Sequence, residues 1–166
     1  MLNKLNNMIS GLKERDLENN MINENDINEF GFVLVKSEVV LSYYGMAIAG
    51  MFIANEEAVK KANVPMIIVD DIFTNLSEST RLFILGHELG HLQHEVQIGQ
   101  YVRKINDEFE ADEYGAKLVG TENAINALND MKNILMEEYF LDEEDEPIVE
   151  INTRIENLRN KAIVMC

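Results

Sequence analysis

Hydrophobic residues recur at helical spacing at the start of the chain and over much of its second half. Leu2, Leu5, Ile9 and Leu12 lie three or four positions apart, which predicts an amphipathic helix over residues 1–12. Four longer helices are expected later, over residues 76–96, 107–119, 122–140 and 151–163. The pattern therefore places most of the helical structure in the second half of the chain.

Residues typical of helix ends flank several of these segments. Asn75 and Glu78 have the spacing of a capping box at the start of the first long helix, and Thr121 can cap the third. Gly120 follows the second, where a glycine readily takes the left-handed conformation that ends a helix. These residues set the boundaries that we expect.

Shorter segments with β-branched and aromatic residues lie between the first helix and the later ones. FGFVLV, YYGMAIAGMFI and VPMIIVDD have the composition of strands, and NEEAVKKAN reads as a short helix. Residues 14–29 are polar and Asn-rich, which suits either a loose linker or a second, exposed helix. Strands followed by helices predict an α+β fold.

The length of 166 residues favours one domain with a small appendage. We expect residues 1–28 to form an N-terminal helical or linker segment and residues 29–166 to form the domain. The hydrophobic share of 46% is enough for an ordinary globular core.

The chain is strongly acidic, with 14 basic and 30 acidic residues and a formal net charge of −16. Nucleic acids and anionic membrane surfaces attract clusters of Lys and Arg, so this balance argues against both as partners. Basic partners would be attracted, but high solubility is the simpler interpretation of the charge.

Three features predict a cytoplasmic protein without membrane insertion. The single cysteine, Cys166, cannot form an intrachain disulfide. Residues 1–16 lack the apolar core of a signal peptide. The longest apolar run, residues 46–54, is far shorter than the roughly 20 residues that span a bilayer. The oligomeric state is left open.

Two of the three histidines lie in the stretch ILGHELGHLQ, residues 84–93. On a helix, His87 and His91 are stacked one turn apart, so both imidazoles can bind one ion at about 2.0–2.1 Å. Glu88 points past that ion and can take a proton from a water bound to it, which is the H-E-x-x-H arrangement. An accidental pair of exposed histidines is the alternative. The apolar stripe of this helix lies on the opposite face: Leu85, Leu89, Leu92 and Val96.

Zinc peptidases use a third protein ligand and leave a fourth position for water. The segment NDEFEADEYGAKL offers candidates, since Glu108 and Asp112 share one helix face while Glu110 points away. Glu108 can bind the metal, and Asp112 can accept a hydrogen bond from a ligand histidine and fix its tautomer. Gly115 lies beside this face and permits close approach of another helix. Acidic pairs with this spacing are also common on solvated surfaces.

HELGH followed by EFEAD resembles the gluzincin type of zinc metallopeptidase, most closely the HtpX-like and CAAX-protease-like family. MIIVDD and TRIENL also look like that family, and RLFILGHELGHL equally resembles the ImmA-type peptidases that cleave phage repressors. The resemblance covers about residues 65–158. It implies a small zincin-like α+β domain over residues 29–166, with a short twisted sheet and an HExxH active-site helix packed with further helices. It also implies roles for five residues: His87, His91 and Glu108 as ligands of one Zn²⁺ per chain, Glu88 as general base, and Asp112 as a hydrogen-bond partner behind the ligands.

Two features depart from the family. The membrane spans of HtpX-like enzymes are absent. A His-Pro pair often precedes the family's RI..L segment, whereas here Glu146 precedes Pro147, so the histidine that would stabilise the transition state is missing. The candidates for its role are Tyr101, Tyr114, Tyr139 and Arg154.

Two further features have a functional and a simpler interpretation. His94 follows the motif on the same helical face, but three ligands on one helix would span about 10.5 Å, so we expect His94 at the rim. MIIVDD resembles the gluzincin edge strand that pairs with an extended substrate. A purely structural strand is the alternative.

Together these residues predict a zinc-dependent endopeptidase that hydrolyses peptide bonds through a metal-bound water, with Glu88 as general base. The substrate would be a protein or peptide. One alternative is an ImmA-type regulatory protein that binds or cleaves a transcriptional repressor. Another is a zinc-containing binding protein with little turnover. Glu88 favours the enzyme, since a binding protein has no need of the base.

Overall fold

The computed structural model describes residues 2–43, 46–54, 56–61, 63–93 and 105–164 of the chain. The chain forms two compact units, residues 1–76 and residues 77–166. The expected N-terminal segment, residues 1–28, belongs to the first unit.

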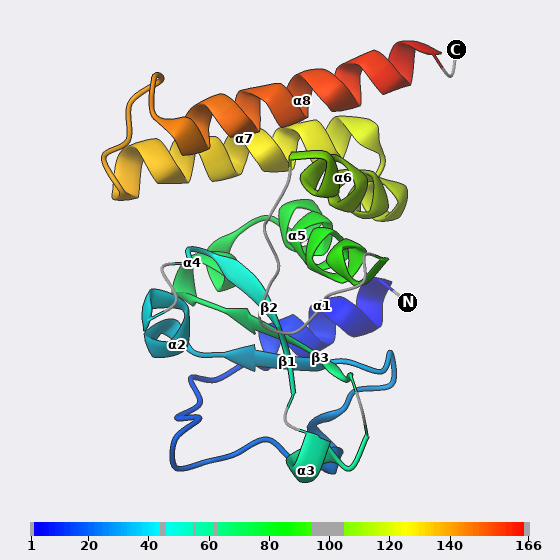
Figure 1. The fold of residues 1–166 in the computed structure, drawn as a ribbon, viewed down its shortest axis with the longest axis vertical. Helices are drawn as coiled ribbons and strands as arrows, with labels where there is room; N and C mark the ends of the chain where they lie inside the picture. Colours follow the sequence, from blue (N-terminus) through cyan, green and yellow to red (C-terminus); the bar gives the residue numbers. More distant parts are fainter. Residues whose placement is uncertain (1, 44–45, 55, 62, 94–104, 165–166) are drawn as a thin grey trace. The chain divides into compact units, whose positions relative to one another are not determined.

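The first unit combines three short strands with short helices (Figure 1). The strands fall on the three segments that were expected to be strands, with β1 ending one residue beyond FGFVLV, and NEEAVKKAN contains a short helix as predicted. Two other short helices, α2 and α4, were not expected. In chain order the elements are α1 (Leu2–Ser10), the 3₁₀-helix η1 (Glu24–Asp26), β1 (Val33–Lys36), α2 (Glu38–Tyr43), β2 (Ala49–Ile53), α3 (Glu56–Val59), β3 (Pro65–Val69) and α4 (Asp71–Asn75).

The three strands form one mixed sheet in the order β1-β3-β2 (Figure 1). β1 pairs with β3 in parallel, with Val33 opposite Met66, and β2 pairs with β3 antiparallel, with Ala49 opposite Val69. β3 is thus the central strand, and its last three residues are buried. The prediction that MIIVDD is an edge strand for substrate pairing is therefore wrong, because β3 is already hydrogen-bonded on both sides.

Residues 14–29 form neither a loose linker nor a long exposed helix. The guanidinium of Arg15 bonds both carboxylate oxygens of Asp26, at 2.7 and 3.0 Å, and helix is limited to η1. Ile22 anchors the segment in a buried cluster because it is one of its few apolar side chains. The other members of this cluster are Val33, Val35, Ala54, Val59 and Val64.

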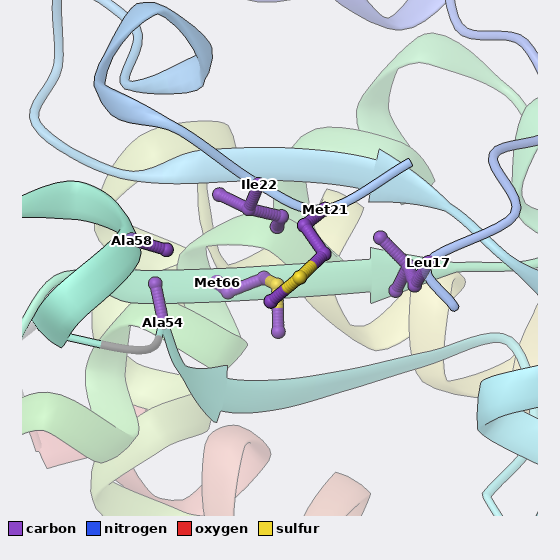
Figure 2. A pocket seen from close by; sticks show the side chains of 6 residues that line it. All are labelled: Leu17, Met21, Ile22, Ala54, Ala58 and Met66. Atoms are coloured by element: carbon purple, nitrogen blue, oxygen red, sulfur yellow. The ribbon is translucent and has the colours of Figure 1, made fainter. Parts of the chain in front are cut away.

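A hollow of about 150 Å³ lies beside this cluster (Figure 2). Figure 2 shows Met21 extending toward Met66, which stands on β3. The lining side chains are all apolar, so they offer no polar group to orient a ligand, and the volume is below the roughly 300–1,000 Å³ usual for ligand pockets. They are Leu17, Met21, Ile22, Ala54, Ala58 and Met66.

All regular elements in the described part of the second unit are helices. Its elements are α5 (Glu78–Gly90), the 3₁₀-helix η2 (His91–Gln93), α6 (Ile105–Val119), α7 (Thr121–Glu138) and α8 (Glu146–Val164). α7 and α8 run side by side in opposite directions, as a helical hairpin (Figure 1). α5 packs against both α6 and α7.

Several helix ends differ from the prediction. Ser77, not Asn75, caps α5, because its Oγ accepts the N–H of Thr80 at 3.2 Å. α5 ends at Gly90 and a 3₁₀ turn follows, while the end predicted at residue 96 lies outside the described residues. Gly120 ends α6 with φ +86°, as predicted, and Thr121 is the first residue of α7 rather than its cap.

The last helix also begins earlier than expected, at Glu146 rather than residue 151. Pro147 stands in its first turn, where the missing N–H of a proline has no helical partner to lose. The acidic segment before it therefore forms only the short connection between α7 and α8.

α5 is buried around most of its circumference rather than on one stripe. Residues 82–87 are all buried, whereas Leu89 and Leu92 from the expected apolar stripe are half-buried. Val96 lies outside the described residues. The face that carries His87, opposite the expected apolar stripe, packs against α6, so a site on this face is an interior site.

The α+β fold class is confirmed, with a small mixed sheet and eight α-helices in the described part of the chain. None of the described helices is both long and apolar enough to cross a membrane.

Candidate metal centre

Small residues let α5 and α6 approach closely. A Cβ atom added to Gly86 would be 2.8 Å from the Cα of Gly115, and one added to Gly115 would be 2.8 Å from the carbonyl oxygen of Phe83. Gly90 lies against Ala111 in the same way, with 2.8 Å from the added Cβ to the Cα. The prediction that Gly115 permits close helix approach is confirmed. The two glycines in ILGHELGHLQ also serve this packing.

This approach brings together the three predicted metal ligands. One ligand atom each from His87, His91 and Glu108 lies within 4.8 Å of the others, so this group could hold a metal ion. His87 and Glu108 are buried, and His91 is half-buried. His91 stands on η2, one residue after the end of α5, and its ring still meets that of His87 edge-on, with 4.7 Å between centroids.

The distances within this group suit a four-coordinate zinc ion. The Nε2 atoms of His87 and His91 are 3.1 Å apart, and each is 3.4 or 3.6 Å from an oxygen of Glu108. Ligand atoms around a tetrahedral zinc at about 2.0–2.1 Å are separated by about 3.3–3.4 Å. Two imidazoles and a carboxylate are also a donor set that zinc prefers. The residues present therefore fit the ion.

Asp112 orients the ring of His87. Its Oδ1 lies 2.8 Å from Nδ1 of His87, and the carboxylate is fully buried. An ionised carboxylate can only accept a hydrogen bond, so Nδ1 carries a hydrogen and donates a hydrogen bond to Asp112. The lone pair of Nε2 is then the one that can bind a metal, which is the tautomer found in carboxylate–histidine–zinc arrangements. The sequence placed Asp112 in this role.

Arg154 on α8 completes the cluster from the other side. Its guanidinium bonds both oxygens of Asp112, at 2.6 and 2.8 Å. It also lies 3.4 Å from Oε2 of Glu108, 3.9 Å from Glu150 and 3.3 Å from Nδ1 of His87. Only 3% of Arg154 is exposed. One buried cation thus contacts both acidic residues behind the histidines.

These contacts set the charges of the cluster. Burial and the nearby Arg154 lower the pKa of His87, but the hydrogen bonds with Asp112 and Glu108 outweigh them and raise it to about 9. Burial raises the pKa of Asp112, but the hydrogen bonds from Arg154 and His87 hold it below its usual value. The carboxylates therefore favour a positive charge at His87, and a metal ion at Nε2 supplies one.

Three other candidates from the sequence are among the described residues. Glu88 follows His87 on α5 and is half-buried. Tyr114 is half-buried on α6, with its Cβ close to Gly90, and Tyr139 is half-exposed at the end of α7. His94 and Tyr101 lie outside the described residues.

The contacts of Arg154 with the buried carboxylates were not predicted from the sequence, which suggested Arg154 only as one of four candidates for stabilising the transition state. Its side chain is instead engaged by buried carboxylates. A signal was present in the helix pattern, because Arg154 falls on the apolar stripe of α8. The buried residues of that stripe are Ile148, Ile151, Ile155 and Leu158.

No family model, curated protein or solved structure matches this chain.

Proposed function

We propose that this protein is a zinc-dependent endopeptidase with a minimal gluzincin-type centre in a zincin-like fold. The convergence of His87, His91 and Glu108 supports the proposal most directly. Two histidines and a glutamate are the protein ligands of several catalytic zinc sites, whereas structural zinc sites are closed by four ligands rich in cysteine. Three protein ligands leave a position for water or substrate.

Glu88 is the proposed general base. Zinc bound by the three ligands would polarise the carbonyl of the scissile peptide and make a water molecule acidic near neutral pH. Glu88 then takes the proton from the attacking water and passes it to the leaving amine. Glu88 is half-buried, which suits this role, because a general base has to be partly withdrawn from water and still reach the substrate.

The other polar residues of the centre hold the ligands in place. Asp112 accepts a hydrogen bond from Nδ1–H of His87, which leaves Nε2 as the nitrogen available to the metal. Glu108 is 1% exposed, and its two oxygens face the two histidines. A buried carboxylate in this position favours a cation between the histidines.

The proposed substrate is a protein or peptide. A regulatory protein of the ImmA type, or a zinc-containing binding protein with little turnover, would use the same ligands. Glu88, the residue after the ligand His87 in the sequence, supports the enzyme, because binding alone does not need a proton acceptor at that position.

The test combines metal analysis with a cleavage assay. Purified protein should contain about one zinc ion per chain and should cleave casein, an unstructured substrate, until a chelator is added. His87→Ala and His91→Ala each remove one of three ligands and should abolish both properties. Stoichiometric zinc in His87→Ala would contradict the metal centre. Bound zinc without any chelator-sensitive cleavage would contradict the peptidase.

A further inference from the structure

Arg154 and His87 hold the same carboxylate. Oδ1 of Asp112 lies 2.6 Å from Nη2 of Arg154 and 2.8 Å from Nδ1 of His87. Oδ2 of Asp112 accepts a second bond from Nε of Arg154, at 2.8 Å. Two bonds from one planar guanidinium fix both the position and the plane of a carboxylate. The oxygen that meets His87 is therefore set by Arg154.

We propose that Arg154 is a positioning residue of the metal centre, acting through Asp112 to keep Nε2 of His87 directed at the metal. The inference rests on the metal centre proposed above. The chain of contacts runs from α8 through α6 to α5, so three helices determine the orientation of one imidazole. Arg154 also lies 3.4 Å from Oε2 of Glu108, so its guanidinium contacts a second proposed ligand directly.

The position of Arg154 excludes a direct contact with substrate as its main role. The side chain is buried, and Nη2 lies 3.3 Å from Nδ1 of His87, the ring nitrogen on the side away from the proposed metal. A purely structural ion pair is the competing explanation. Buried ion pairs are often replaceable by apolar residues without loss of stability, so stability alone gives little reason to retain one.

The experiment measures the zinc dissociation constant by competition with a chromogenic chelator. Arg154→Met should weaken zinc binding about 10–100-fold, the usual effect of losing a residue that orients a ligand. Arg154→Lys keeps the charge but cannot make the two-pronged contact, so its loss should be smaller but still measurable. Wild-type affinity in a folded Arg154→Met protein would overturn the proposal.

A double variant tests whether Arg154 acts through Asp112. Asp112→Asn should weaken zinc binding to a similar degree, and Arg154→Met/Asp112→Asn should bind zinc no more weakly than the weaker single variant. Losses that multiply in the double variant would mean that Arg154 acts by another route. The visible absorption of bound Co²⁺ should change in the single variants, since it reports the ligand geometry rather than the stability of the fold.

Arg159→Met is the matched control on the same helix. Arg159 is half-exposed and pairs with Glu156 at 2.7 Å, so its loss should leave zinc affinity unchanged. If Arg154→Met does not fold, as judged by circular dichroism, Arg154→Lys decides, and wild-type affinity there would overturn the proposal. Absence of zinc binding by the wild-type protein would refute the metal centre itself, and this inference with it.

Discussion

Nδ1 of His87 and Oδ1 of Asp112 are 2.8 Å apart, which joins the helix of the HExxH motif to the helix that carries the third candidate ligand. This contact fixes the rotation of α6, because Glu108 lies one turn before Asp112 and must face α5 as well. Glu110, two residues later, is exposed. The arrangement predicts a sharp difference between two neighbouring glutamates.

Glu108→Ala should lose zinc affinity by more than about 100-fold, beyond the usual effect of losing an outer hydrogen-bond partner. Glu110→Ala, the matched control, should bind zinc as the wild-type protein does. Equilibrium dialysis against zinc buffers measures both constants under the same conditions. Equal losses in the two variants would show that the register of α6 is wrong.

Zinc binding should release a proton near neutral pH. The pKa of His87 is raised to about 9 by its contacts with Asp112 and Glu108, against the effects of burial and of Arg154. Below pH 9 the imidazole of His87 is therefore doubly protonated in the metal-free protein. Zinc must displace the second proton, on Nε2, before it can bind there. Affinity should rise by up to tenfold per pH unit from about pH 7 to pH 9 and then level off.

Calorimetric titration in two buffers of different ionisation enthalpy counts the released protons. About one proton per zinc is expected at pH 7, about half a proton at pH 9 and almost none above about pH 10. The same shift works in the opposite direction for the metal-free fold. A group whose pKa rises on folding adds stability that is complete below about pH 6.5 and is lost as the pH approaches 9. Proton-independent zinc binding at pH 7 would contradict this account.

The helical half of the fold was readable from the sequence because long amphipathic helices leave a periodic pattern that survives without tertiary context. Two of the short helices were not predicted from it. α2 and α4 have six and five residues, and α4 depends on the side chain of Asp70, which caps it by accepting the N–H of Phe73. The order of the strands in the sheet could not be predicted from the sequence either, because strand pairing joins residues that are far apart in the chain. The interpretation of MIIVDD as an edge strand is therefore wrong, while the alternative of a purely structural strand agrees with the central position of β3.

The candidate site was likewise predicted from the sequence only in part. The positions of His87, His91 and Glu108 followed from spacing on two helices, and the structure brings these residues together. The burial of Arg154 did not follow, because it depends on how α8 packs against α6. A charged residue on an apolar helix stripe indicates such packing, but it does not show which residues the charge will contact.

Gly115→Ala tests the close approach of α5 and α6. The added methyl group would lie 2.8 Å from the carbonyl oxygen of Phe83, and backbone cannot move aside as a flexible side chain can. We expect a loss of about 1–3 kcal/mol in the free energy of unfolding, together with weaker zinc binding as Glu108 shifts from the histidines. Urea unfolding and zinc titration measure the two effects.

Gly11→Ala is the control for this substitution, since its methyl group would be 3.6 Å from the nearest carbonyl oxygen, an ordinary contact. It should leave zinc affinity unchanged. If Gly115→Ala has the same free energy of unfolding and the same zinc affinity as Gly11→Ala, the spacing between α5 and α6 does not determine zinc binding.

Glu88→Gln separates chemistry from binding. The amide has nearly the same shape as the carboxylate and leaves the three proposed ligands intact, so bound zinc should remain at about one ion per chain. It cannot accept a proton from water, and general-base routes contribute typically 10²–10⁴ in rate, so casein cleavage should fall at least about a hundredfold. Casein should still bind, and retention on immobilised Glu88→Gln protein measures this. Cleavage at the wild-type rate would show that Glu88 is not the base. Loss of zinc from the variant would place Glu88 among the ligands instead.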